Sequence, residues 1–154
     1  MGRKVICLYC GENFDRDLES FIQVGNRYAH EKCFEYGDKI HKLMKDLLQK
    51  NYGPVKINRQ LASFHKDGYS LQDIYETLVY WYEIKKGDVS KANGGVGIFP
   101  YVYPEYIQYK EQQEKIAQTN RGKKVSDYVN KDGPHIEAKI DPSWRIRGIK
   151  FFNL

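Results

Sequence analysis

Cys7-Leu8-Tyr9-Cys10 and, after nineteen intervening residues, His30-Glu31-Lys32-Cys33 are the stretches that determine how this chain folds. They contain all three of its cysteines. Two ligands separated by two residues can converge on one metal ion from a tight turn, and three cysteines with one histidine are a ligand set of tetrahedral structural zinc. The spacing therefore predicts a bound Zn²⁺ held by Cys7, Cys10, His30 and Cys33.

The predicted zinc is structural, because four protein ligands fill a tetrahedron and leave no open position for a reacting water. Outside the ligand set, His41 is expected on a helix surface, His65 beside a helix dipole, and His135 in a loop without an assignable role. A treble-clef nuclease of the His-Asn-His type is the sharpest catalytic alternative, but it needs a catalytic histidine where His30 is already a zinc ligand. Metal-bound thiols are also unavailable as nucleophiles. The sequence thus predicts no enzymatic activity and no small-molecule substrate.

Short strands are expected around the ligands, at residues 4–6, 21–24 and 27–29. Gly25-Asn26 fits the turn of a hairpin between the last two strands. Gly11 follows the second cysteine, at a place where a positive φ is often required. The pair His30 and Cys33 is expected to open a helix. The tight turn Cys7-Leu8-Tyr9-Cys10-Gly11 is called the zinc knuckle below. A strand, this knuckle, a hairpin and a helix in this order predict a treble-clef-like zinc module over residues 1–36.

Apolar residues at helical spacing predict a helical domain over residues 37–118. The first helix, 37–50, carries a stripe of Ile40, Leu43, Met44, Leu47 and Leu48. The others are expected at 57–64, at 70–85 behind a capping box of Ser70 and Asp73, and at 105–118 behind Pro104. Residues 119–154 are expected to form an extended basic C-terminal segment. The predicted fold class is α+β, with the small zinc module packed on three to four helices.

Residues 86–103 are predicted to form a loop. Its run Gly94-Gly95-Val96-Gly97 has the glycines of a phosphate-binding turn but lacks the context, since no strand leads into it and no Gly-Lys-Ser/Thr follows. We therefore interpret the run as a tight crossing of the backbone. The apolar residues expected to pack back on the helices after it are Ile98, Phe99, Tyr101 and Tyr103.

The motifs carry two resemblances. The segment Cys7-x2-Cys10-x19-His30-x2-Cys33-Phe34 resembles the first zinc-binding half of a LIM domain, although the second set of ligands is absent. The cysteine and histidine pairs, followed by Tyr80-Trp81-Tyr82-Glu83 and by Asn93-Gly94-Gly95-x-Gly97-Ile98, are similar to a family of small proteins encoded by bacteriophages of Gram-positive bacteria. This resemblance implies a phage or prophage origin, a bacterial host cytoplasm and a zinc site at the same four residues. It implies no catalytic residues.

The chain is mildly basic, with a net charge of +5 and a pI of about 9.0. Most of the excess lies near the C-terminus, where the residues suited to contact phosphate backbones are Arg121, Lys123, Lys124, Arg145, Arg147 and Lys150. A solvated end that binds nothing is the competing interpretation. The helix pair at 57–85 could be a helix-turn-helix, but Asp73, Glu76 and Glu83 make its second helix a poor reader of a DNA groove.

Two functions of different classes are compatible with this sequence. The first is a non-enzymatic, zinc-stabilised accessory protein of a phage that binds nucleic acid through the basic tail and exposed tyrosines. The second is an adaptor or inhibitor that docks on a host or phage protein through an aromatic surface, since the chain has thirteen tyrosines and seven phenylalanines. No apolar run is long enough to span a membrane, and three cysteines without a secretory signal favour a reducing cytoplasm.

Overall fold

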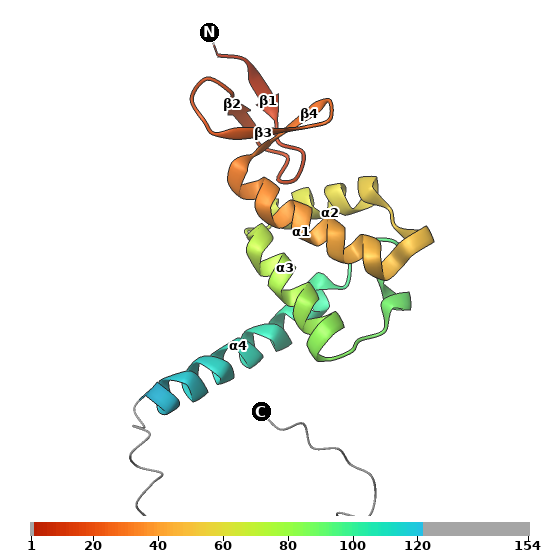
Figure 1. Ribbon diagram of the computed structural model, residues 1–154, viewed down its shortest axis with the longest axis vertical. Helices are drawn as coiled ribbons and strands as arrows, with labels where there is room; N and C mark the ends of the chain where they lie inside the picture. Colours follow the sequence, from red (N-terminus) through yellow and green to blue (C-terminus); the bar gives the residue numbers. More distant parts are fainter. Residues whose placement is uncertain (1, 122–154) are drawn as a thin grey trace, which may run out of the picture. The chain divides into compact units, whose positions relative to one another are not determined.

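The structure is a computed structural model, which describes residues 2–121 (Figure 1). In this part of the chain two antiparallel hairpins precede four α-helices, which confirms the predicted α+β class. The strands are β1 (Lys4–Ile6), β2 (Asn13–Asp15), β3 (Phe21–Val24) and β4 (Arg27–His30). The helices are α1 (Glu31–Leu48), α2 (Pro54–Lys66), α3 (Leu71–Val79) and α4 (Phe99–Arg121), with short helical turns at Gln49–Asn51, Tyr80–Ile84 and Val89–Ala92. The contacts described below lie within the compact unit that ends at Glu114.

The two hairpins are joined through the first cysteine. Cys7 forms a parallel bridge with Tyr28, and the backbone N–H of Leu8 donates to the carbonyl oxygen of Tyr28 over 2.8 Å. Gly25, in the turn between β3 and β4, has a φ of 60°, and Gly11 has a φ of 75°. Both glycines therefore take the left-handed conformation that the sequence predicts for them.

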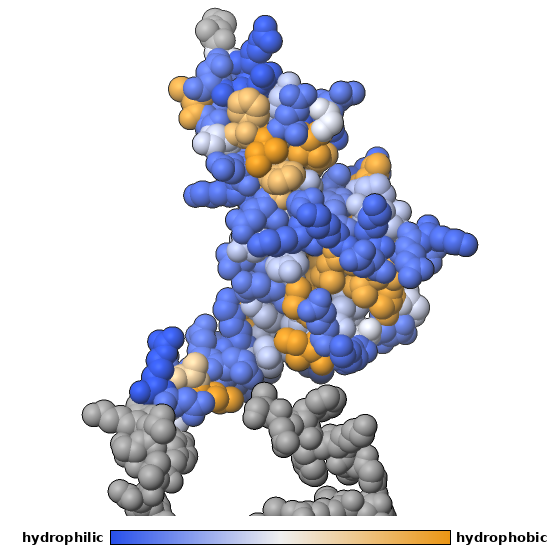
Figure 2. All heavy atoms as spheres, viewed as in Figure 1, coloured by the Kyte–Doolittle hydropathy of each residue, from blue (hydrophilic) through white to orange (hydrophobic). Residues whose placement is uncertain are grey.

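Helix α1 leads from the β-hairpins into the helical part (Figure 1). It begins at Glu31 rather than at residue 37, because the second ligand pair opens the helix as expected. Ile40 and Met44 are fully buried, and Leu48 is nearly so. Figure 2 shows that hydrophilic side chains cover much of the viewed face, and that hydrophobic side chains gather where the hairpins meet α1 and again over the helical body below. The same helix thus carries a predicted metal ligand in its first turn and core side chains along its length.

The next two helices agree with the predicted ones. Helix α2 contains residues 57–64 and extends them at both ends, with Pro54 in its first turn. The hydroxyl oxygen of Ser70 accepts a hydrogen bond from the backbone N–H of Asp73 over 3.1 Å, which confirms the capping box. Helix α3 continues as a π-helical turn over Tyr80–Ile84, so helical backbone covers almost all of the predicted helix at 70–85.

The fourth helix begins earlier than predicted. It starts at Phe99, inside the predicted loop, and Pro104 lies exposed within it. Proline is expected at a helix start because it has no N–H to donate to the preceding turn. Packing overrides this preference, since Phe99 is fully buried and Val102 is 3% exposed on the same helix. Tyr101 is 83% exposed, so its predicted packing on the helices is wrong.

The glycine-rich run is a tight crossing over α2, as the sequence predicts. A Cβ at Gly95 would lie 2.3 Å from Oε1 of Gln60, and the backbone N–H of Val96 donates to the same oxygen over 2.7 Å. A Cβ at Gly53 would lie 2.9 Å from the carbonyl oxygen of Gly94. Close packing against Gln60 of α2 therefore accounts for Gly95 and Gly97, and the φ of 73° accounts for Gly94.

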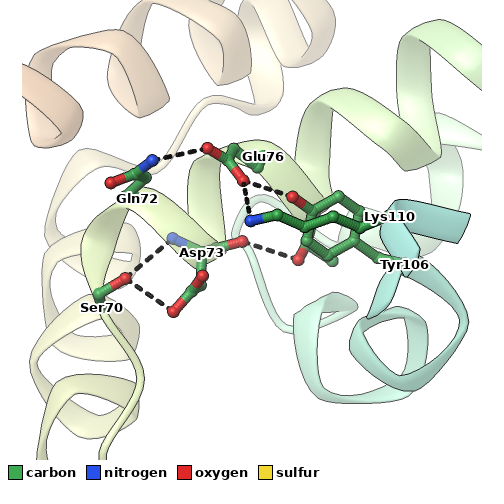
Figure 3. A network of polar contacts seen from close by, with 7 residues as sticks. Ser70, Gln72, Asp73, Glu76, Tyr106 and Lys110 are labelled. Carbon is green, nitrogen blue, oxygen red and sulfur yellow. Dashed lines mark hydrogen bonds and ion pairs between the residues drawn. The ribbon is translucent and has the colours of Figure 1, made fainter. Parts of the chain in front are cut away.

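A polar network joins α3 to α4 (Figure 3). The carboxylate of Glu76 accepts hydrogen bonds from Nε2 of Gln72 over 2.8 Å, from the hydroxyl of Tyr106, and from Nζ of Lys110 over 3.3 Å. Tyr106 and Lys110 of α4 thus contact the polar face of α3 that carries Gln72 and Glu76. Glu76 is half-buried and its carboxylate is engaged by Tyr106 and Lys110 of α4, which agrees with the poor suitability of this helix as a reader of a DNA groove.

Replacing Gly37 of α1 by alanine should destabilise the protein by roughly 1–3 kcal/mol, although alanine is the better helix former. A Cβ at this position would lie 2.6 Å from Cγ of Tyr9, whose side chain in the knuckle is 4% exposed. Denaturant unfolding followed by circular dichroism measures the effect. Ser63→Ala, at an exposed position of α2, is the control and should not destabilise. A Gly37→Ala protein as stable as the wild type would contradict the packing of the knuckle on α1.

The Glu76 network predicts a pH dependence of stability. Burial acts to raise the pKa of Glu76, but hydrogen bonds from Tyr106, Gln72 and Lys110 outweigh it and hold the pKa below its ordinary value of 4.5. A carboxyl group with a depressed pKa stabilises the fold above its unfolded pKa, and this contribution disappears as the pH falls through the folded pKa.

We therefore expect Glu76→Gln to lower the free energy of unfolding by about 1 kcal/mol at neutral pH and to flatten its dependence on pH below 4.5. Urea unfolding of the wild type and the variant across this range measures both. Glu111→Gln, at an exposed position of α4, is the matched control. Equal pH profiles for all three proteins would show that the network carries no charge-dependent stability.

Candidate metal centre

The four predicted ligands converge at one point between the hairpins and α1. Cys7 and Cys10 come from the knuckle after β1, His30 is the last residue of β4, and Cys33 lies in the first turn of α1. One donor atom from each residue can be chosen so that all four lie within 4.8 Å of one another. Residues far apart in the sequence thus form a single Cys3His cluster, which could bind a metal ion.

The spacing of the donors fits zinc. Nδ1 of His30 lies 3.5 Å from Sγ of Cys10 and 3.6 Å from Sγ of Cys33. Tetrahedral zinc with ordinary Zn–S and Zn–N bonds places a sulfur and a nitrogen ligand about 3.6 Å apart. Cys7 and Cys10 are each 1% exposed, so the cluster is closed to bulk water on the knuckle side.

The electrostatics of the cluster favour a cation. Hydrogen bonds from the thiols of Cys10 and Cys33 lower the pKa of Cys7 far below its ordinary value. The same contacts, first with Cys10 and then with Cys7, raise the pKa of the Cys33 thiol, and burial adds to the rise. The close approach of the three sulfurs thus favours a thiolate at Cys7 and opposes one at Cys33. A divalent ion removes this conflict by binding all three as thiolates, with release of their protons.

Neighbouring side chains orient the imidazole of His30. Its Nε2 lies 3.6 Å from Oε2 of Glu19, and the ring of Phe14 lies 4.2 Å from the imidazole between centroids. A carboxylate that faces the second ring nitrogen fixes the tautomer of a metal-binding histidine and makes it a better donor. Glu19 thus faces Nε2, while Nδ1 lies on the side of the ring toward Cys10 and Cys33. The sequence alone does not reveal this role, because Glu19 lies in a loop with no regular spacing to the ligands.

A second group of polar side chains connects the cluster to α2. Oε2 of Glu12 lies 3.9 Å from Sγ of Cys10, and Oε1 of Glu12 lies 3.3 Å from Nε2 of His65. His65 stands in the last turn of α2, as the dipole argument predicts. The structure adds a contact that the sequence does not indicate, and this contact links the knuckle to the C-terminal end of α2.

The expected surface position of His41 is wrong. Its Nε2 donates to Oδ1 of Asn58 over 2.7 Å, and its Nδ1 accepts from the hydroxyl of Tyr52 over 2.5 Å. Burial lowers the pKa of His41, while the Asn58 contact opposes this. The imidazole is therefore a neutral bridge between α1, α2 and the turn that joins them, and it lies apart from the metal cluster.

The predicted nucleic-acid contacts fall mostly beyond the part of the chain that the structure describes. Arg121 is the last residue of α4 and is exposed. The remaining candidates outside the described residues are Lys123, Lys124, Arg145, Arg147 and Lys150. Separately, none of the helices within residues 2–121 combines the length and the apolar character that a membrane crossing requires.

Together, fold and site define a small α+β protein in which a Cys3His cluster suited to metal binding joins two hairpins to a helical body. The uncharacterized protein YorH, derived from the SPbeta prophage of Bacillus subtilis (strain 168), is 33% identical to the chain over 127 residues, which cover 77% of this chain and 80% of the relative. The chain belongs to the family of this prophage-derived protein, in agreement with the expected phage origin. No protein-family model and no solved structure matches the chain, so the resemblance to a LIM domain stays a prediction.

The Glu19 contact predicts graded effects on metal binding. Cys33→Ser should abolish stoichiometric zinc binding, whereas Glu19→Gln should weaken it about 10–100-fold and still permit folding at saturating zinc. Competition against a chromophoric chelator gives the affinities, and thermal melting with and without chelator gives the coupling to stability. Asp17→Asn, which removes an exposed carboxylate from the same loop, is the control. Zinc affinity in Glu19→Gln equal to that of the control would contradict the orienting role.

Proposed function

We propose that this protein is a non-enzymatic accessory protein of a phage, that zinc at Cys7, Cys10, His30 and Cys33 stabilises its N-terminal module, and that it acts by binding nucleic acid. The ligand set supports the structural role of the metal. Four protein donors complete a tetrahedron, so the ion would have no position for a substrate or a reacting water.

The observation that carries the nucleic-acid proposal is the exposed face of α2. Four exposed residues follow one another at helical spacing along this helix: Lys56, Arg59, Ser63 and Lys66. We call this the cationic face of α2. The helix has no aspartate or glutamate anywhere along its length. Among the residues that the structure describes, no carboxylate forms an ion pair with the cationic face of α2.

The opposite side of α2 fixes this face in place. Ile57 and Leu61 are fully buried, and the side chains of Asn58 and Gln60 are held by His41 and by the backbone N–H of Val96. The cations of this face therefore project from a backbone that is held in place, which suits contact with a regular row of phosphates.

The aromatic content gives less support to the adaptor hypothesis. Many of the rings pack against one another: Phe99 lies 5.1 Å from Phe64, 5.0 Å from Tyr69 and 5.2 Å from Tyr103 between ring centroids. Tyr101 is the large exception, at 83% exposure. Aromatic side chains thus build the core of the described region, and their number does not by itself indicate a docking surface.

Fluorescence anisotropy with the full-length protein and a labelled DNA or RNA of about 16 nucleotides tests the proposal. We expect binding that weakens steeply between about 50 and about 200 mM salt, because bound phosphates release counterions. Absence of binding at low salt and micromolar protein would refute it. A stoichiometric protein partner from a nuclease-treated bacterial lysate would then favour the adaptor function.

The cationic face of α2 predicts a specific mutational pattern. Arg59→Ala with Lys66→Ala should reduce the slope of log affinity against log salt by about two, because each removed cation leaves one phosphate without a protein counter-charge. The matched control is Lys39→Ala with Lys42→Ala, which removes the same charge from two lysines that are paired with Glu35 and Asp38. Equal reductions in both proteins would mean that net charge, and not this face, drives binding.

A further inference from the structure

A groove lies between the zinc knuckle and α2. It has a volume of about 320 Å³, and the residues that shape it are Ile6, Leu8, Arg27, Val55, Asn58 and Arg59. The knuckle packs closely on the helix at the floor of the groove, since a Cβ at Gly11 would lie 3.2 Å from Cβ of Ala62. Cys7 also lines the groove. The position of one wall therefore depends on the ligands of the metal cluster.

All formal charge in this groove is positive. Arg27 comes from the first position of β4, and Arg59 belongs to the cationic face of α2. No aspartate or glutamate lines the groove, and neither arginine forms an ion pair within residues 2–121. Guanidinium groups bind phosphate oxygens in a bidentate manner and also present flat faces on which bases can stack. Two arginines without a carboxylate partner in the described part of the chain thus complement a short stretch of nucleic-acid backbone.

The apolar residues of the groove distinguish between forms of nucleic acid. Ile6 is 54% exposed and Val55 is 65% exposed, so aliphatic surface stands in water beside the two arginines. A duplex presents phosphates while its bases remain stacked inside. A single strand can turn its bases outward onto apolar side chains and guanidinium planes while its phosphates meet the charges.

The geometry points to this groove as a binding site for single-stranded nucleic acid, in which Arg27 and Arg59 hold phosphate and base while Ile6 and Val55 pack against an unstacked base. The inference rests on the proposed function and makes it specific, since it names the form of nucleic acid and the site. The adjacent cationic face of α2 extends the path for the backbone beyond the groove.

The test compares the affinities of the full-length protein for one labelled DNA strand and for the duplex of the same sequence. We expect the single strand to bind at least about tenfold more tightly at moderate salt. Ile6→Ser with Val55→Ser should weaken single-strand binding about tenfold and leave the duplex affinity unchanged, because only an unstacked base uses the apolar surface. Arg27→Ala should weaken single-strand binding and reduce its salt slope by about one.

Leu18→Ser is the matched control, because Leu18 is 84% exposed in the same module and does not line the groove. Thermal melting confirms that each variant is folded. Equal affinity for strand and duplex, or an Ile6/Val55 double variant that binds like the control, would overturn the inference while the proposed function stands. Absence of all nucleic-acid binding would overturn both. Displacement of the strand by poly-glutamate as efficiently as by unlabelled strand would identify the groove as a site for acidic peptides instead.

Discussion

The convergence of three thiols and one imidazole at a single point is the constraint on which the rest of this structure depends. The hairpins consist of strands of only three or four residues, and an isolated two-stranded hairpin is marginally stable in water. Structural zinc contributes on the order of 10 kcal/mol in small domains that fold around it. A metal at this point would tie the knuckle, the end of β4 and the start of α1 together, and each of these already lies where the ligands require it.

Beyond the cluster, the helices are held by a core of aliphatic and aromatic side chains and by a few well-satisfied polar groups. His41 bridges α1 to α2 through Asn58, and Gln60 holds the glycine-rich crossing against α2. Glu76 receives donors from α4. Buried polar groups are costly unless they are paired. These contacts therefore favour one arrangement of the helices over others that would bury the same apolar surface.

The distribution of charge connects this architecture to function. The carboxylate of Glu76 on α3 faces α4, and Glu12 and Glu19 stand beside the Cys3His cluster. Helix α2, which lacks carboxylates, presents its cations to solvent next to the groove along the knuckle. A mildly basic chain can thus offer a locally positive surface, because no carboxylate lies among the cations of α2.

The sequence by itself determined the four side chains that form the Cys3His cluster, the α+β class, the hairpin turn at Gly25 and the cap at Ser70. Each of these depends on local chemistry, such as ligand spacing, a left-handed turn or a side chain that caps its own helix. The early start of α4 before Pro104, the bridging role of His41 and the orientation of His30 by Glu19 were decided by the tertiary structure. These features depend on which distant side chains meet, and neither hydrophobic periodicity nor residue propensity contains that information. The groove between the knuckle and α2 belongs to the same group, because Arg27 and Arg59 become neighbours only when the hairpin packs on the helix.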